Sequence, residues 1–295
     1  MTAGVGRHAL ARLAEHGFVR RVLRSVYVAG QVPDGLLLRA RALALITPQD
    51  AAVTDWSACW LHTGVLGPGE HLATPPVSIF RSPGGCRLRN DLCSSGERTF
   101  SRDDLTVLEG VTVTTPLRTA LDLGRLQKRD WALAGIDALL RAGAFTTTAL
   151  LDNVERFKGH RGVVQLRELA PLGDGRAESP PESVLRLRWL DLPSLPRPEP
   201  QVSITLPSGH EIYRIDLGVR ALRFGLEYDG EEHHSSNADR AHDLRRRNDL
   251  AERFGWLVVP VTKANVFGAG RDVERILHEG VRAARRRLGQ PRDTA

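Results

Sequence analysis

The stretch LRFGLEYD, residues 222–229, decides the fold expected for the last third of the chain. Alternate side chains of a strand lie on opposite faces, so Glu227 and Asp229 are predicted to share one face. The opposite, apolar face would hold Leu222, Phe224, Leu226 and Tyr228. Residues 211–217 are predicted to form the preceding strand, and the short link 218–221 favours an antiparallel hairpin. That hairpin would bring Asp216 close to Glu227.

Carboxylates that converge from neighbouring strands repel each other and lose hydration, which a bound cation relieves. Mg²⁺ or Mn²⁺ suits such oxygen ligands and can activate water for phosphodiester hydrolysis. Asp216 and Glu227 could instead pair with Arg214 or Arg223 as surface salt bridges, each worth at most about 1 kcal/mol. The pattern favours the metal site.

The order of elements around this hairpin resembles the restriction-endonuclease-like PD-(D/E)xK superfamily, in the branch related to very-short-patch-repair endonucleases. The resemblance covers residues 176–290 and includes GWLVVPVT, residues 255–262, as a buried third strand. It implies an αβββαβα domain with a mixed central sheet. It also implies metal ligation by Glu182, Asp216 and Glu227, and catalysis by Asp216, Glu227, Asp229 and His233.

One position departs from that superfamily: Asp229 stands where the motif has its lysine. The resemblance therefore implies that His233 or His234, just past the strand, acts as general base. Glu182 also has a structural interpretation, because Ser179 followed by two prolines and Glu182 is typical of a capping box. A fold that has lost its chemistry can persist as a binding module.

The first 31 residues carry most of the net charge of +6: five arginines against one glutamate give this segment +4. Apolar spacing predicts a helix over residues 7–14, ended by Gly17 as a left-handed cap. Residues 18–22 and 26–28 are predicted to form a two-stranded ribbon. A helix and an arginine-rich ribbon are typical of the end of a winged helix-turn-helix that contacts DNA. The predicted DNA contacts are Arg7, Arg12, Arg20, Arg21 and Arg24.

The stretch HGFVRRVLRSVYV, residues 16–28, resembles the N-terminal winged helix of AbiE-type (type IV) antitoxins and related actinobacterial proteins. That family has further helices before the recognition helix, whereas only residues 1–6 precede it here, and Ser25 stands where the family usually has glycine. Residues 1–31 are thus predicted to be a partial winged helix. The alternative is a solvated hairpin packed on the next domain.

Residues 32–170 are predicted to be an α+β scaffold without chemistry of their own. Helices are expected over 36–46, 50–61, 131–140 and 146–157, and GVTVTTPLRTALDLG, residues 110–124, predicts a strand followed by a helix. Residues 56–58 and 114–119 resemble the middle segment of the same antitoxin family. The whole chain is therefore expected to be α+β, and a Pro/Gly-rich linker at 171–176 separates the last domain.

Composition excludes several classes of protein. The apolar runs are too short to cross a membrane, residues 1–6 lack the features of a secretory signal, and three cysteines without a Cys-x-x-Cys pair predict neither a disulfide framework nor a zinc site. A cytoplasmic protein is expected. In the last domain, Arg245 and Arg246 are predicted to contact DNA, or to lie on a solvated helix face.

The sequence as a whole predicts a DNA-binding protein with a metal-dependent endonuclease domain. The alternative is a non-catalytic transcriptional regulator, an antitoxin of a type IV toxin-antitoxin system with an inert nuclease-like fold, which would bind the operator of a cognate toxin gene.

Overall fold

The computed structural model describes residues 5–23, 25–48, 50–68, 77–84, 93–230 and 237–289, except for the side chains of 36 and 237–243. Their packing divides the chain into two compact units, residues 1–173 and 174–295. Both units combine helices with a mixed sheet, which confirms the predicted α+β class.

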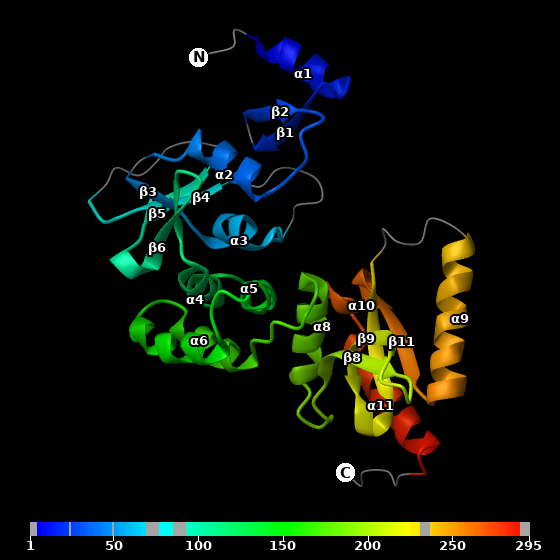
Figure 1. Ribbon diagram of the computed structural model, residues 1–295. Helices are drawn as coiled ribbons and strands as arrows, with labels where there is room; N and C mark the ends of the chain where they lie inside the picture. The colour runs from blue at the N-terminus through cyan, green and yellow to red at the C-terminus, as the bar shows by residue number, and fades with distance from the viewer. Residues whose placement is uncertain are drawn as a thin grey trace. The chain divides into compact units, whose positions relative to one another are not determined.

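The first unit begins with helix α1 (Arg7–Glu15), followed by the antiparallel strands β1 (Val19–Leu23) and β2 (Val26–Ala29) (Figure 1). Gly17 has a φ of +74°, the left-handed conformation predicted for the residue that ends this helix. Ser25 has a φ of +65°, in the region that favours glycine, so the turn strains its backbone.

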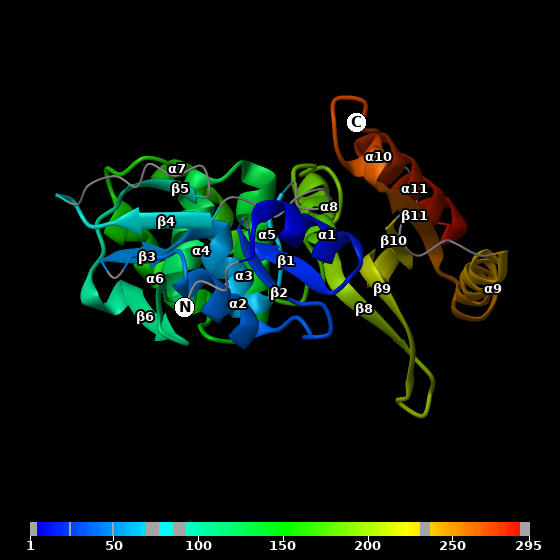
Figure 2. The same cartoon turned by 90° about the horizontal axis from the view of Figure 1, so that it is seen from above.

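The hairpin packs into the core of the first unit. Val22, Leu23 and Val26 are buried in one apolar cluster with helices α2 (Leu36–Ala44) and α3 (Asp55–Thr63) and with the sheet beneath them. That sheet has the strand order β5-β4-β3-β7-β6, of which Figure 2 labels β5, β4, β3 and β6. Its strands are β3 (Ala51–Val53), β4 (Val77–Arg81), β5 (Cys93–Glu97), β6 (Leu105–Leu108) and β7 (Val111–Thr114). The hairpin and the segment after it therefore share a core.

The helix predicted over residues 50–61 is wrong in its first turn. Residues Ala51–Val53 form β3, antiparallel to β4 on one side and parallel to β7 on the other. Helix α3 starts only at Asp55. Pairing with two neighbours in the centre of a sheet outweighs the helix propensity of the two alanines, because local propensities differ by less than about 1 kcal/mol per residue.

A layer of helices completes the first unit. Helix α4 (Pro116–Leu126) follows β7 directly, with Thr115 as its N-cap and Pro116 in its first turn, as the strand-then-helix prediction requires. Helices α5 (Arg129–Arg141) and α6 (Thr147–Val154) lie where they were predicted, whereas α7 (Val163–Leu169) was not predicted.

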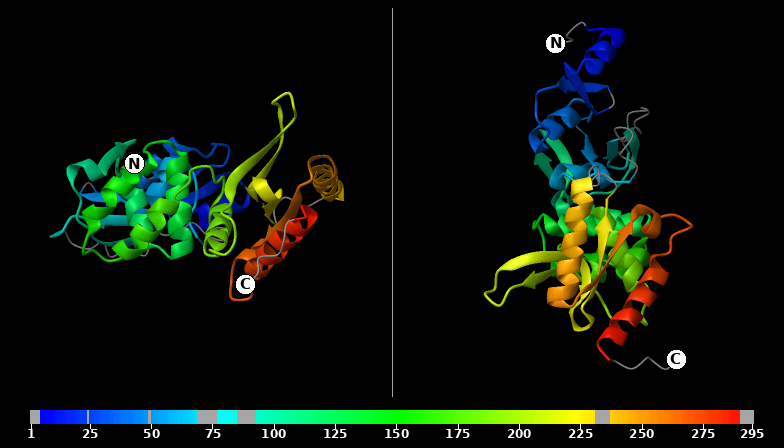
Figure 3. Two further views of the ribbon diagram at one scale, coloured as in Figure 1. Left: turned by 90° about the horizontal axis from the view of Figure 1, so that it is seen from below. Right: turned by 90° about the vertical axis from the view of Figure 1, so that its right-hand side faces the viewer.

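The second unit follows the order helix, three strands, helix, strand, helix predicted for residues 176–290. Its strand order is β11-β10-β9-β8, with β10 and β11 parallel and the other pairs antiparallel (Figure 3). The strands are β8 (Glu199–Thr205), β9 (Glu211–Val219), β10 (Phe224–Asp229) and β11 (Leu257–Thr262). The helices are α8 (Pro180–Leu190), α9 (Asn237–Phe254), a short α10 (Lys263–Val266) and α11 (Val273–Arg287).

The two faces of this sheet are covered by different helices. Helices α8, α10 and α11 share one apolar cluster around Phe224, whereas α9 inserts Leu250 into a second cluster with Val202 and Ile215. Strand β11 was predicted to be buried but lies at the sheet edge, and Val261 is its only fully buried residue. Among the residues that the structure describes, no helix is both long and apolar enough to cross a bilayer.

Candidate functional site

The arginines predicted to contact DNA differ in what surrounds them. Arg7, Arg12 and Arg21 are exposed, on α1 and β1. Arg20 is half-buried, and its Nε and Nη2 donate to the carbonyl oxygen of Val32 at 3.3 and 2.9 Å. Its guanidinium thus ties β1 to the chain beyond β2. Arg24 lies outside the described residues.

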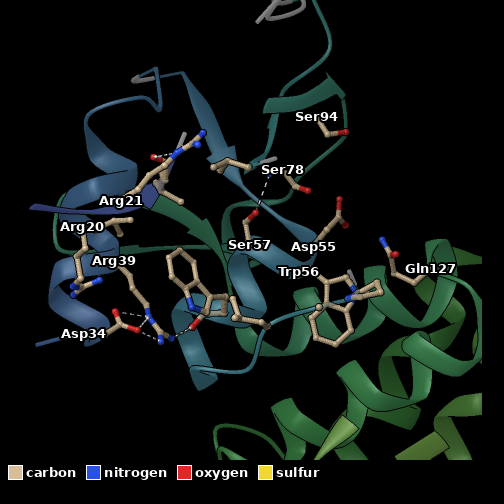
Figure 4. A pocket seen from close by; sticks show the side chains of 17 residues that line it. Arg20, Arg21, Asp34, Arg39, Asp55, Trp56, Ser57, Ser78, Ser94 and Gln127 are labelled. Atoms are coloured by element: carbon tan, nitrogen blue, oxygen red, sulfur yellow. Dashed lines mark hydrogen bonds and ion pairs between the residues drawn. The ribbon is translucent and has the colours of Figure 1, made fainter. Parts of the chain in front are cut away.

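A pocket of about 460 Å³ lies next to β1 and is lined by residues of α2, α3, β4 and β5 as well (Figure 4). On one side Arg39 is paired with Asp34 at 2.5 Å and lies 4.6 Å from the centre of the Trp60 ring. Trp56 and Gln127 lie on the side away from Arg20 in Figure 4. The wall of the pocket therefore contains two tryptophan rings, and the charge of Arg39 is already neutralised by Asp34.

The acids predicted in the second unit do come together. Asp216 lies on β9 antiparallel to β10, and its Oδ2 accepts a hydrogen bond from the backbone N–H of Tyr228 at 2.8 Å. Burial, followed by the negative charges of Glu182 and Glu227, raises the pKa of Asp216 from an ordinary value of 3.8 to about 7. The predicted approach of Asp216 to Glu227 is thereby found in the fold.

Glu182 is buried and accepts several hydrogen bonds. Its carboxylate receives the backbone N–H of Glu178 at 2.9 Å, the hydroxyl of Ser179 at 2.8 Å and the side-chain amide of Gln201 at 2.8 Å. Ser179 in turn accepts the N–H of Glu182. These contacts hold the start of α8 against β8, which is the structural interpretation of this glutamate.

Glu227 and Arg246 were predicted for different partners and contact each other. Nη1 of Arg246 lies 2.7 Å from the Glu227 carboxylate, and Nη2 donates to the backbone oxygen of Arg214 at 2.7 Å. Arg246 thus joins α9 to the sheet, whereas Arg245 beside it is exposed.

The positions of Glu182, Asp216 and Glu227 do not form a recognisable metal site. Within the described ranges, no group of three or more His, Cys, Asp or Glu side chains is arranged to hold a metal ion. Three donors already contact Glu182, and Glu227 is ion-paired with Arg246. Asp229 lies at the end of β10 beside Thr262, while His233 and His234 fall outside the described residues.

Sequence reasoning missed a buried network of charges in the first unit. Its centre is Asp122 on α4, which has no solvent exposure and accepts hydrogen bonds from three arginines. The distances are 3.2 Å to Arg98, 2.8 Å to Arg118 and 2.8 Å to Arg125. Arg98 also binds both oxygens of Asp55, at 2.8 and 3.0 Å.

The network continues from Arg118 to Asp104 and Arg156. Arg118 donates to Asp104 at 2.6 Å, and Asp104 also accepts from Arg156 at 2.8 Å. Burial lowers the pKa of Arg98, but Asp55 and Asp122 outweigh it, so the pKa is raised and the guanidinium stays charged. The available signal was the spacing of Arg118, Asp122 and Arg125, which places three charges on one face of a predicted helix.

Comparison with known proteins gives a family for the first unit. The family model for the AbiEi antitoxin C-terminal domain matches residues 22–172. Two uncharacterized proteins of Mycobacterium tuberculosis, from two strains, are each 37% identical to this chain over 159 residues, or 54% of this chain. The match spans 58% of the length of each relative. Since the family model begins within β1 and extends to the end of the first unit, the chain belongs to the AbiEi antitoxin C-terminal domain family.

Proposed function

We propose that this protein is a DNA-binding antitoxin that acts in the cytoplasm and regulates the operator of a cognate toxin gene. The family match over residues 22–172 carries the proposal. The exposed arginines of α1 and β1 add to it, because a helix and an adjoining ribbon with exposed guanidinium groups can contact DNA phosphates. In this proposal the second unit is a non-catalytic module.

The exposed arginines should account for part of the salt dependence of DNA binding. Each phosphate contact contributes about 0.9 to the slope of log K against log salt. The double change Arg12→Ala with Arg21→Ala is therefore expected to lower that slope by about 2. Fluorescence anisotropy with a labelled duplex from immediately upstream of the gene, over a series of salt concentrations, measures it.

Two matched variants sharpen this experiment. Arg167→Ala removes an exposed arginine of α7 that pairs with Glu155 at 2.8 Å. Arg167 is far along the chain from the hairpin, so this variant should leave the slope unchanged. Arg20→Ala removes the tie to Val32, so it should also lower the thermal stability of the first unit. An unchanged slope in the Arg12/Arg21 variant would remove α1 and β1 from the DNA interface.

Phosphodiester hydrolysis by the second unit is the second candidate function. The observation that favours it is Asp216, because a carboxyl group with a pKa of about 7 is suited to general acid–base catalysis near neutral pH. Mg²⁺ or Mn²⁺ would supply Lewis-acid activation of water when bound. Since Glu182 and Glu227 have other partners, the described side chains do not fit a metal centre, and no step through a metal follows.

A nicking assay separates the two candidates. If the second unit is a nuclease, the full-length protein converts supercoiled plasmid to open circles with Mg²⁺ or Mn²⁺, and Asp216→Asn abolishes this. Asp191→Asn, an exposed aspartate at the end of α8, serves as the control and should keep full activity. Absence of nicking by the unaltered protein, which is the result expected for the antitoxin, would eliminate the nuclease hypothesis.

A further inference from the structure

We propose that a second hollow in the first unit, whose wall contains Arg98, Arg118 and Arg125, binds a small ligand that carries a phosphate group. The ligand class includes nucleotides and inorganic phosphate or pyrophosphate. The proposal is independent of DNA binding by α1 and β1, and it concerns residues that sequence reasoning had treated as scaffold.

The hollow has a volume of about 490 Å³, which exceeds the room needed for a phosphate ion alone. It lies between the β4 and β5 strands, helix α4 and the segment before α7. Its lining is rich in cationic and aromatic side chains and includes one acid, Glu97. The lining residues are Phe80, Glu97, Arg98, Thr99, Arg118, Arg125, Leu126, Phe157, His160 and Arg161.

The arginines are recessed and held in place. The side chains of Arg98, Arg118 and Arg125 are 10%, 5% and 7% exposed. Phe80 supports Arg98 at 4.0 Å, and Phe157 supports Arg125 at 4.5 Å, measured from the guanidinium carbon to the ring centre. Stacked and ion-paired guanidinium groups lose little further freedom when a ligand binds, so the wall is preorganised.

Arg125 keeps hydrogen-bonding capacity that the described protein does not use. Its Nη1 donates to the backbone oxygen of Arg161 at 3.0 Å, and its Nη2 donates to Asp122. Its Nε is buried and has no hydrogen-bond partner among the described residues. A buried donor without an acceptor is destabilising, and a shift of the Arg125 side chain that brings its Nε to a phosphate oxygen would relieve this.

The charges of the network leave an excess of cations. Four arginines, Arg98, Arg118, Arg125 and Arg156, are linked to three aspartates, Asp55, Asp104 and Asp122. The hollow is also lined by one further cation, Arg161, and one further anion, Glu97. The three buried arginines and the three buried aspartates balance one another, and the excess positive charge is that of Arg156, whose side chain is 40% exposed. This excess raises the local positive potential, which favours an anion.

The backbone is strained at one end of the network and depends on glycine at the other. Asp55, which holds Arg98, has a φ of +53°, a conformation that strains the backbone of a residue with a side chain. Gly162 has a φ of +79°, and a Cβ there would lie 1.8 Å from the backbone oxygen of Arg125. Only glycine lets the segment carrying His160 and Arg161 close against α4.

The recessed position selects a small ligand over duplex DNA. The phosphates of a duplex lie on a broad convex surface, which reaches exposed arginines such as Arg161 but not guanidinium groups that are nine-tenths covered. Three guanidinium groups in one wall also suit a phosphate, which carries up to two negative charges and three terminal oxygens, better than a single carboxylate.

Ligand binding can be measured on the full chain by isothermal titration calorimetry and thermal shift. The probes are phosphate, pyrophosphate, AMP and ATP, with sodium chloride at matched ionic strength as reference. At least one probe is expected to bind with a sub-millimolar dissociation constant and to raise the melting temperature. Arg125→Lys keeps the charge but loses the planar fork, and should weaken binding by about tenfold or more.

Arg161→Ala alters only an exposed rim side chain, so it decides the matter even if the Arg125 variant does not fold; it should weaken binding several-fold. Arg167→Ala, an exposed arginine outside the hollow, should leave binding unchanged. The proposal is overturned if every probe acts only through ionic strength, or if the Arg161 and Arg167 variants respond alike. Displacement of the bound probe by duplex DNA would assign the hollow to the DNA interface and also overturn it.

Discussion

Asp122→Asn is expected to destabilise the first unit by about 3–5 kcal/mol, a large part of the stability of an ordinary domain. The change removes the one carboxylate that Arg98, Arg118 and Arg125 share, and leaves three buried guanidinium groups around a neutral amide. Urea unfolding, followed by circular dichroism and by tryptophan fluorescence, measures the loss.

Asp152→Asn makes the same chemical change at an exposed position on α6 and should leave the urea midpoint where it is. If the Asp122 and Asp152 variants have the same midpoint, the network contributes nothing to the fold. A phosphate-bearing ligand should raise the urea midpoint of less stable variants that retain the hollow, because a ligand that binds only the folded state stabilises it.

Asp216→Asn is expected to stabilise the second unit at pH 8 by up to about 4 kcal/mol. The pKa of Asp216 is about 7 in the folded protein, against an ordinary value of 3.8. Between these values the folded state binds a proton that the unfolded chain does not, so stability falls as the pH rises from about 4 to about 7. Above pH 7 the penalty for the buried charge is complete, and asparagine removes it.

Asparagine keeps an acceptor for the Tyr228 N–H, so the substitution removes the charge without losing that contact. The measurement is the unfolding free energy at pH 5 and pH 8: the gain should be near its full value at pH 8 and less than half as large at pH 5. A variant that is less stable than the unaltered protein at pH 8 would contradict this. Stabilisation of the unaltered protein by Mg²⁺, absent in the variant, would instead support the metal hypothesis.

The sequence was informative where a local pattern decides the structure. The alternation in residues 222–229 predicted the apolar face that packs in the second unit, and the short link before it predicted the hairpin that brings Asp216 near Glu227. Ser179 with Glu182, Gly17 and Thr115 each end or begin a helix where the residue types require it. These features depend on neighbours a few residues away, so one sequence is enough to predict them.

The partners of charged side chains could not be predicted in the same way. Arg246 was assigned to DNA and Glu227 to a metal, yet the two are paired across 19 positions of the chain. Arg20 was assigned to DNA but contacts Val32. A charge that looks free in a linear pattern is used wherever the fold brings an opposite charge or a carbonyl group within reach.

The sequence by itself determined the α+β class, most of the helices and strands, and the concentration of positive charge in the first 31 residues, since these follow from composition and short periodicities. Only the tertiary structure decided that Ala51–Val53 is a central strand and that Asp122 collects three arginines. Asp55 and Arg98 are separated by 43 positions, and their pairing depends on how the sheet and α4 pack. Burial sets the strength and the role of such charges, and burial is a property of the packed fold.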